Sequence, residues 1–111
     1  MSIRSVLFDG LKSIPGVGMV VSEWPKAFTT LPLICFQVYY STPLKIFSYD
    51  QESEVTVLIN LWGADKVGIS ELALEVSAKM AQLGYRRTME MDNSSLENDL
   101  KRIDMRFKSH N

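Results

Sequence analysis

The chain has 111 residues, which is the usual length of one domain. With 46% hydrophobic and 23% charged residues, its composition is that of a globular protein and excludes a largely disordered chain. The 12 basic and 13 acidic residues leave a net charge of −1, which argues against a strongly basic nucleic-acid-binding module. A single cysteine, Cys35, excludes an intrachain disulfide and a cysteine zinc site, and a single histidine, His110, argues against a histidine metal site or a histidine-based triad.

Targeting signals are not evident in the chain. No stretch approaches the ~20 apolar residues of a membrane-spanning helix. Asp9 interrupts any signal-peptide core near the N-terminus, and no cleavage site follows it. We therefore expect a protein that is made and kept, or assembled, in a cytoplasm, with Cys35 as a small hydrophobic residue in the core of a strand.

The N-terminal segment predicts a helix over residues 2–14, followed by a short strand over residues 17–22. Ser2 is a suitable N-cap, and Pro15 with Gly16 ends the helix. The apolar residues that fall at helical spacing are Ile3, Val6, Leu7, Leu11 and Ile14.

Two stronger strands are predicted in the middle of the chain. Residues 33–40 are apolar on both faces, which is typical of a strand that is central or covered by a second layer. Residues 54–62 alternate, and we expect one parity to face the core. That parity comprises Val55, Val57, Ile59 and Leu61.

A helix over residues 67–83 follows, and Gly84 stands where a C′ glycine belongs. Residues 85–107 predict a closing hairpin in which Tyr85, Met89 and Met91 share one face. The order of these elements predicts an α+β fold, with two helices packed on one face of a mainly antiparallel sheet.

Two short patterns resemble sites of chemistry, and a structural explanation is favoured for both. The acidic cluster Asp50, Glu52 and Glu54 lacks the spacing and the glycine of a calcium loop and is better explained as a charged strand edge. Gly16 and Gly18 form a Gly-x-Gly pattern with no preceding strand and no third glycine, so a turn is favoured over a dinucleotide site. We therefore expect no catalytic residues, cofactor or metal.

The last 32 residues contain a basic set that could contact phosphates, although five acidic residues lie in the same region. Cross-strand salt pairs on a solvated face are the alternative. The basic residues are Arg86, Arg87, Lys101, Arg102, Arg106 and Lys108.

Several aromatic residues flank loops rather than periodic stripes, and aromatics are typical of interfaces as well as cores. Both interpretations remain open for Tyr40, Phe47, Tyr49 and Trp62.

An ordered set of short motifs runs through residues 20–108. It comprises Trp24-Pro25 with Phe28, Leu31-Pro32-Leu33-Ile34, Tyr39-Tyr40, Asn60-Leu61-Trp62, Met80 with Leu83-Gly84-Tyr85-Arg86-Arg87, and Arg106-Phe107. In this order the motifs resemble the small tail-completion, or tail-terminator, proteins of long-tailed phages and prophages of Gram-positive bacteria.

The resemblance implies an α+β subunit, copies of which form a ring that is usually a hexamer. The ring lies in the virion, at the head-proximal end of the tail. Such a ring caps the tail tube, stops its elongation and meets the neck proteins of the head, while DNA passes through it without specific recognition. It implies partners in the tail-tube protein and a neck or head-completion protein, with no membrane, catalytic residue or cofactor. Residues 50–79 carry six acidic and two basic groups, and this segregated charge permits head-to-tail pairing of copies.

Two segments are the predicted contacts with neighbouring subunits or the tube: residues 39–51 and the hairpin tip at residues 92–99. Two alternatives remain open, a head-closure or neck adaptor and a small nucleic-acid-binding or regulatory module that uses the basic hairpin. The candidate interface residues are Tyr40, Phe47, Tyr49, Glu52, Glu54, Trp62, Asp92, Asn93 and Glu97.

Overall fold

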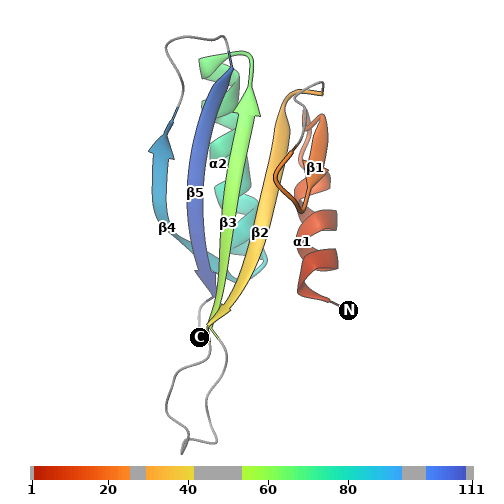
Figure 1. Cartoon of the computed structure of the whole chain (residues 1–111), viewed down its shortest axis with the longest axis vertical. Coiled ribbons are helices and arrows are strands. Elements are labelled where there is room, and N and C mark those ends of the chain that lie inside the picture. Colours follow the sequence, from red (N-terminus) through yellow and green to blue (C-terminus); the bar gives the residue numbers. More distant parts are fainter. Residues whose placement is uncertain (1, 26–29, 42–53, 94–99, 110–111) are drawn as a thin grey trace, which may run out of the picture.

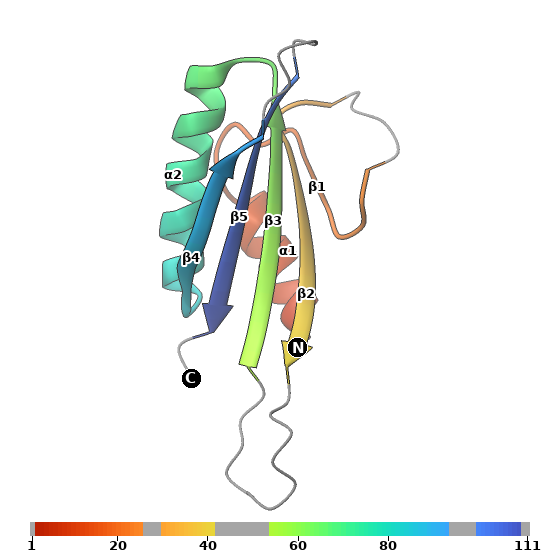
Figure 2. The ribbon, with the colours of Figure 1, turned by 60° about the vertical axis from the view of Figure 1, so that its left-hand side comes forward.

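The computed structural model describes residues 2–25, 30–41, 54–93 and 100–109 of the chain. Its elements, in chain order, are α1 (Ile3–Lys12), β1 (Met19–Val21), β2 (Leu33–Ser41), β3 (Glu54–Gly63), α2 (Lys66–Gln82), β4 (Tyr85–Asp92) and β5 (Lys101–Ser109). The strands form one sheet in the order β1-β2-β3-β5-β4, in which β1 pairs with β2 in parallel and the other neighbours are antiparallel. Both helices lie on the same side of this sheet (Figures 1 and 2), so the predicted α+β fold is confirmed.

The first two elements are shorter than the sequence predicted. Ser2 lies outside α1 as its N-cap, where its hydroxyl oxygen accepts a hydrogen bond from the Ser5 amide at 3.1 Å. The strand predicted over residues 17–22 is shorter at both ends and comprises only the three residues Met19–Val21. Val17 still belongs to the turn after α1, since its amide donates to the Ile14 carbonyl, and the chain leaves the sheet at Ser22.

The main core lies between the sheet and the two helices. The predicted inward parity of β3 is confirmed, because all four of its residues are at least 92% buried. From β2 and β5 the inward residues are Ile34, Phe36, Val38, Ile103, Met105 and Phe107, and they pack against Leu7 and Leu11 of α1 and the buried stripe of α2.

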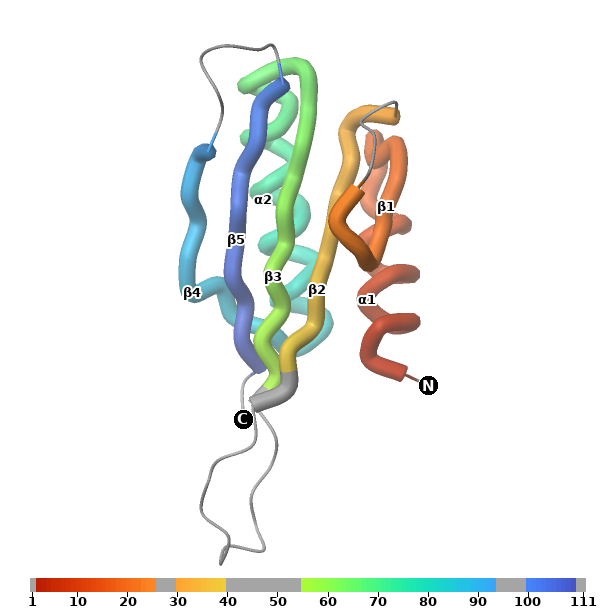
Figure 3. Tube along the Cα trace, in the orientation of Figure 1, coloured from red at the N-terminus to blue at the C-terminus, as the bar shows by residue number. Residues whose placement is uncertain are grey.

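A second, smaller cluster lies on the opposite side of the sheet, which we call the open face. It consists of Leu33, Cys35 and Trp62, with Leu31 and Leu100 packed against it. The chain that leaves β1 at residues 22–25 turns in front of the sheet at this end (Figure 3). The prediction that β2 is central or covered is therefore confirmed by its place between β1 and β3, while its open face is covered only around Leu33 and Cys35.

Strand β4 corrects one prediction about the hairpin. A bulge lies between Arg87 and Met89, so Tyr85 packs against the helix-side core while Met89 and Met91 oppose Arg106 and Asp104 on the open face. The expectation that Tyr85, Met89 and Met91 share one face is wrong, because one inserted residue reverses the side-chain alternation of everything after it.

Both ends of α2 are defined by local capping signals. The Asp65 carboxylate caps the helix by accepting from the Gly68 amide at 3.1 Å. Gly84 has φ of +97°, the left-handed conformation expected of a glycine after a helix, and it turns the chain directly into β4.

Candidate interaction surface

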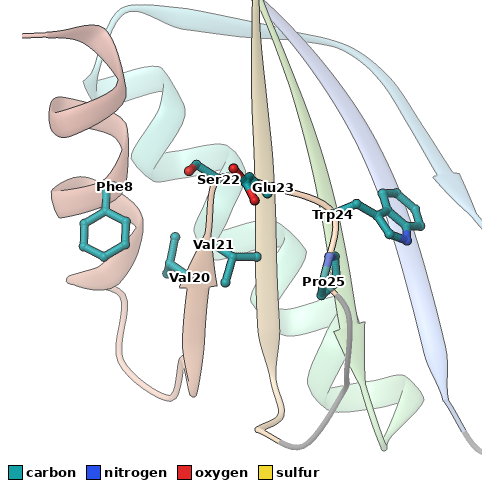
Figure 4. Close-up of a pocket in the computed structure, with 7 residues that line it drawn as sticks. All are labelled: Phe8, Val20, Val21, Ser22, Glu23, Trp24 and Pro25. Carbon is teal, nitrogen blue, oxygen red and sulfur yellow. The ribbon is translucent and has the colours of Figure 1, made fainter.

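The covered end of the open face is organised around Trp24. From the segment after β1, its side chain reaches across the sheet toward β5, whereas Phe8 lies on the α1 side (Figure 4). Trp24 packs edge-on against Trp62 of β3, with ring centroids 5.1 Å apart and an interplanar angle of 87°. Trp62 is 3% exposed and Trp24 is 50% exposed, so Trp24 is both a cover for the sheet and a surface feature.

Arg102 of β5 completes this arrangement. Its guanidinium carbon lies 5.1 Å from the Trp24 ring centroid and 5.7 Å from that of Trp62, which is cation–π geometry for both rings. We call Trp24, Trp62 and Arg102 the Trp–Arg cluster. Trp and Arg are the residue types that most often dominate protein–protein interfaces, so the cluster is a candidate anchor for a partner.

Asp104 of β5 links the Trp–Arg cluster to β3 and to the residue that follows β4. Its carboxylate accepts hydrogen bonds from Arg102 Nε at 2.8 Å, from Asn60 Nδ2 of β3 at 2.6 Å, and from the side-chain amide of Asn93, directly after β4. Burial alone would raise the pKa of Asp104, but these three hydrogen bonds and the positive charge of Arg102 lower it below the usual value of 3.8. The site therefore holds a carboxylate that stays ionised, and its negative charge is bound by side chains of the same chain.

Cys35 of β2 lies beneath residues 22–25, the segment that follows β1. It is fully buried, and its thiol donates a hydrogen bond to the Glu23 carbonyl at 3.1 Å. Burial raises the pKa of Cys35 to about 11, so at neutral pH the thiol carries its proton and is a poor nucleophile. The residue acts as the small core hydrophobe that the sequence predicts.

The predicted interface residues are placed as follows. Trp62 and Asn93 meet at one site, since each contacts a member of the Arg102–Asp104 pair. Asp92 lies opposite Ile103 at the end of β4. Phe47, Tyr49, Glu52 and Glu97 lie outside the described residues, and Tyr40 and Glu54 are placed only by backbone pairing, with Val55 and Ser41.

Trp24, Arg102 and Asp104 are not among the predicted interface residues, although Trp24 belongs to the ordered motifs and Arg102 to the basic set. Trp24-Pro25 is visible in the sequence as an aromatic next to a turn residue, but nothing in the sequence shows that it crosses to β3 and β5. The sequence does not reveal the register in which β3 and β5 pair. That register places Trp62 directly opposite Arg102 and Asn60 opposite Asp104.

The predicted basic hairpin is divided between the two faces of the sheet. Arg86, Arg106 and Lys108 share the open face with Arg102, because Lys108 opposes Arg86 and Thr56, and Arg106 opposes Met89 and Leu58. Arg87 lies on the other side, where it bonds Ser77 of α2 at 3.4 Å and Glu90 at 3.1 Å. The six cations therefore do not form one continuous surface.

A hollow of about 410 Å³ lies beside β1 and the segment that follows it (Figure 4). Of the described residues that line it, from Phe8 and from Val20 through Pro25, Glu23 alone is charged. A lone carboxylate supplies neither a nucleophile–base pair nor a set of metal ligands. In the described part of the chain there is no group of three potential metal-ligating residues, and no helix that is long and apolar enough to span a bilayer.

Comparison with known proteins gives a match at the level of fold. The sequence matches no protein-family model and no curated protein sequence. The structure is similar to that of a chain from the virion of a native gene transfer agent particle, with a TM-score of 0.74 and 12% sequence identity. The match covers 97% of this chain and 92% of the other, so the two share a fold over nearly their whole lengths.

Proposed function

We propose that the chain is a structural, non-enzymatic protein of a phage-like virion, and specifically a tail terminator. In this role, copies form a ring, expected to be a hexamer, on the head-proximal end of the tail tube, stop its elongation and join the tail to the head. The observation that carries the proposal is the fold shared, over 97% of the chain, with a protein of a gene transfer agent virion. The ordered motifs that resemble tail-terminator proteins support the finer role.

The surface of the protein supports a role in assembly. Trp24, in the segment after β1, and Tyr39 of β2 are each about half exposed, and Arg102 lies beside Trp24. Exposed aromatics with few rotatable bonds lose little conformational entropy on binding, which makes them effective interface anchors. The Trp–Arg cluster therefore suits a subunit whose partners are proteins.

The two predicted contact segments leave opposite ends of β3. One lies between Ser41 and Glu54, which pair at the first residue of the strand, and the other precedes Lys101, which pairs with Gly63 at its last residue. Ten residues at roughly 3.3 Å each separate these ends by about 30 Å. We propose that the subunit uses these two separate ends for its contacts with the tail tube and with neighbouring subunits.

The test is to find which half-particle carries the protein. A tagged chain is expressed from the phage or prophage that encodes it, in a strain that makes tails without heads and in one that makes heads without tails. A tail terminator sediments with headless tails and is absent from DNA-filled heads. A head-closure or neck adaptor shows the reverse pattern, and absence from both fractions contradicts any virion role.

A further inference from the structure

The part of the open face that Trp24 does not cover has a defined composition. Strand pairing places its side chains in two rows across the sheet. We call these two rows the basic half of the open face. They are Gln37, Leu58, Arg106 and Met89 in one row, and Tyr39, Thr56, Lys108 and Arg86 in the other.

The basic half combines positive charge with accessible apolar surface. Tyr39 is 51% exposed, Arg86 and Arg106 are exposed, and Leu58 and Met89 are half-buried. None of the eight side chains in the two rows is acidic. Asp104, in the adjacent row, already receives hydrogen bonds from three side chains. A partner that pairs with Arg86 and Arg106 and covers Tyr39, Leu58 and Met89 therefore needs carboxylates beside apolar groups.

The opposite side of the protein carries a surface of that kind. The outer stripe of α2, which faces away from the sheet, holds two exposed carboxylates, Glu71 and Glu75, among exposed apolar side chains. Val67 and Leu74 are 65% and 68% exposed, more than any other large hydrophobic residue that the structure describes. At 3.6 residues per turn these four positions and Ala78 lie within an arc of about 100° around the helix, and Lys66 and Lys79 lie on either side of that arc.

From this complementarity we infer that the basic half of the open face binds the outer stripe of α2 of a second copy of the chain. Acidic residues of one copy meet Arg86, Arg106 and Lys108 of the next, and Val67 and Leu74 cover Tyr39, Leu58 and Met89. Two basic halves facing each other would bring like charges together, so the contact is head-to-tail. The assignment of this interface to a ring rests on the proposed function.

The contact is tested by charge reversal in the purified protein. Arg106→Glu and Glu75→Lys alone each reduce association at least tenfold in sedimentation velocity over a concentration series. The double variant R106E/E75K, and an equimolar mixture of the two single variants, regain it because each pairing again joins opposite charges. Arg4→Glu, a reversal in the first turn of α1, is the matched control and leaves association unchanged.

A second measurement locates the contact. Zero-length carboxyl–amine cross-linking of mixed ¹⁴N and ¹⁵N copies is expected to join Lys108 of one isotope to Glu71 or Glu75 of the other. Wild-type protein that stays monomeric at all concentrations, or association that neither reversal affects, overturns the inference. Binding of a single-stranded oligonucleotide also overturns it, if that binding weakens with salt, is abolished by R106E and is not restored in the double variant. The basic half would then be a nucleic-acid site. Self-association is measured without particles, so its failure is distinguishable from failure of the virion role.

Discussion

At the scale of single residues, Asp104 is the group on which the open face most depends. It is one carboxylate shared by β3, β5 and the residue after β4, and its side chain is 14% exposed. Arg102, which it binds, in turn holds Trp24 and Trp62. The exposed Trp24 therefore packs against a partly buried polar network.

Asp104→Asn is expected to lower the free energy of unfolding by about 1.5–3 kcal/mol at pH 7, the usual value for hydrogen bonds to a charged group. Because the folded pKa of Asp104 is lowered, its stabilising effect is present above the unfolded pKa of 3.8 and is lost as the pH falls through the folded value. Urea unfolding of both proteins between pH 7 and pH 2.5 measures this. The difference between them should be constant above about pH 5 and shrink below pH 4.

Asp9→Asn is the control, since Asp9 is an exposed carboxylate on α1, and it should leave the unfolding curve nearly unchanged. If wild-type protein and Asp104→Asn differ equally at pH 7 and pH 3, the ionised network is not the source of the stability.

At the scale of elements, the placement of β1 depends on a close approach at Gly18. Its amide donates to the Pro32 carbonyl at 2.8 Å, and a Cβ atom there would lie 3.0 Å from the carbonyl oxygens of both Leu31 and Pro32. Backbone atoms cannot move aside as a flexible side chain does. The Gly-x-Gly pattern of the sequence is therefore explained by the turn and by this contact.

Gly18→Ala is expected to destabilise the protein by about 1–3 kcal/mol, the usual cost of overpacking. Gly68→Ala is the matched control, because its Cβ would make an ordinary contact of 3.4 Å with Asp65 and lie in α2, where alanine is favoured by up to about 1 kcal/mol. The two variants should shift the thermal midpoint in opposite directions. Equal shifts would show that the approach of β1 to residues 31–32 is not tight.

The elements also show what the sequence could predict. Hydrophobic period, caps and turn residues were sufficient for both helices, all five strands and the inward face of β3. The bulge in β4 was not predictable, because Arg87, Thr88 and Met89 carry no turn residue and the alternation looks continuous. The Trp–Arg cluster depends on contacts between Trp24, Trp62 and Arg102, which are distant in sequence and come together only through the strand register.

At the scale of the whole molecule, the protein is a two-layer particle with different surfaces on its two sides. The helix side presents the acidic outer stripe of α2, and the sheet side presents the basic half of the open face and the Trp–Arg cluster. The net charge of −1 conceals this separation. Unlike surfaces on opposite sides favour head-to-tail assembly over a two-fold dimer, and a head-to-tail contact closes into a ring when each step includes a suitable rotation.

The proposed tail-terminator role is tested most directly by tail length. Particles from a phage or lysogen that lacks the chain are imaged by electron microscopy, beside a strain in which the gene is restored. The account predicts overlong tail tubes of irregular length that are not attached to heads, and their correction on restoring the gene. Tails of normal length beside DNA-filled heads that fail to join, or intact infectious particles, would contradict it.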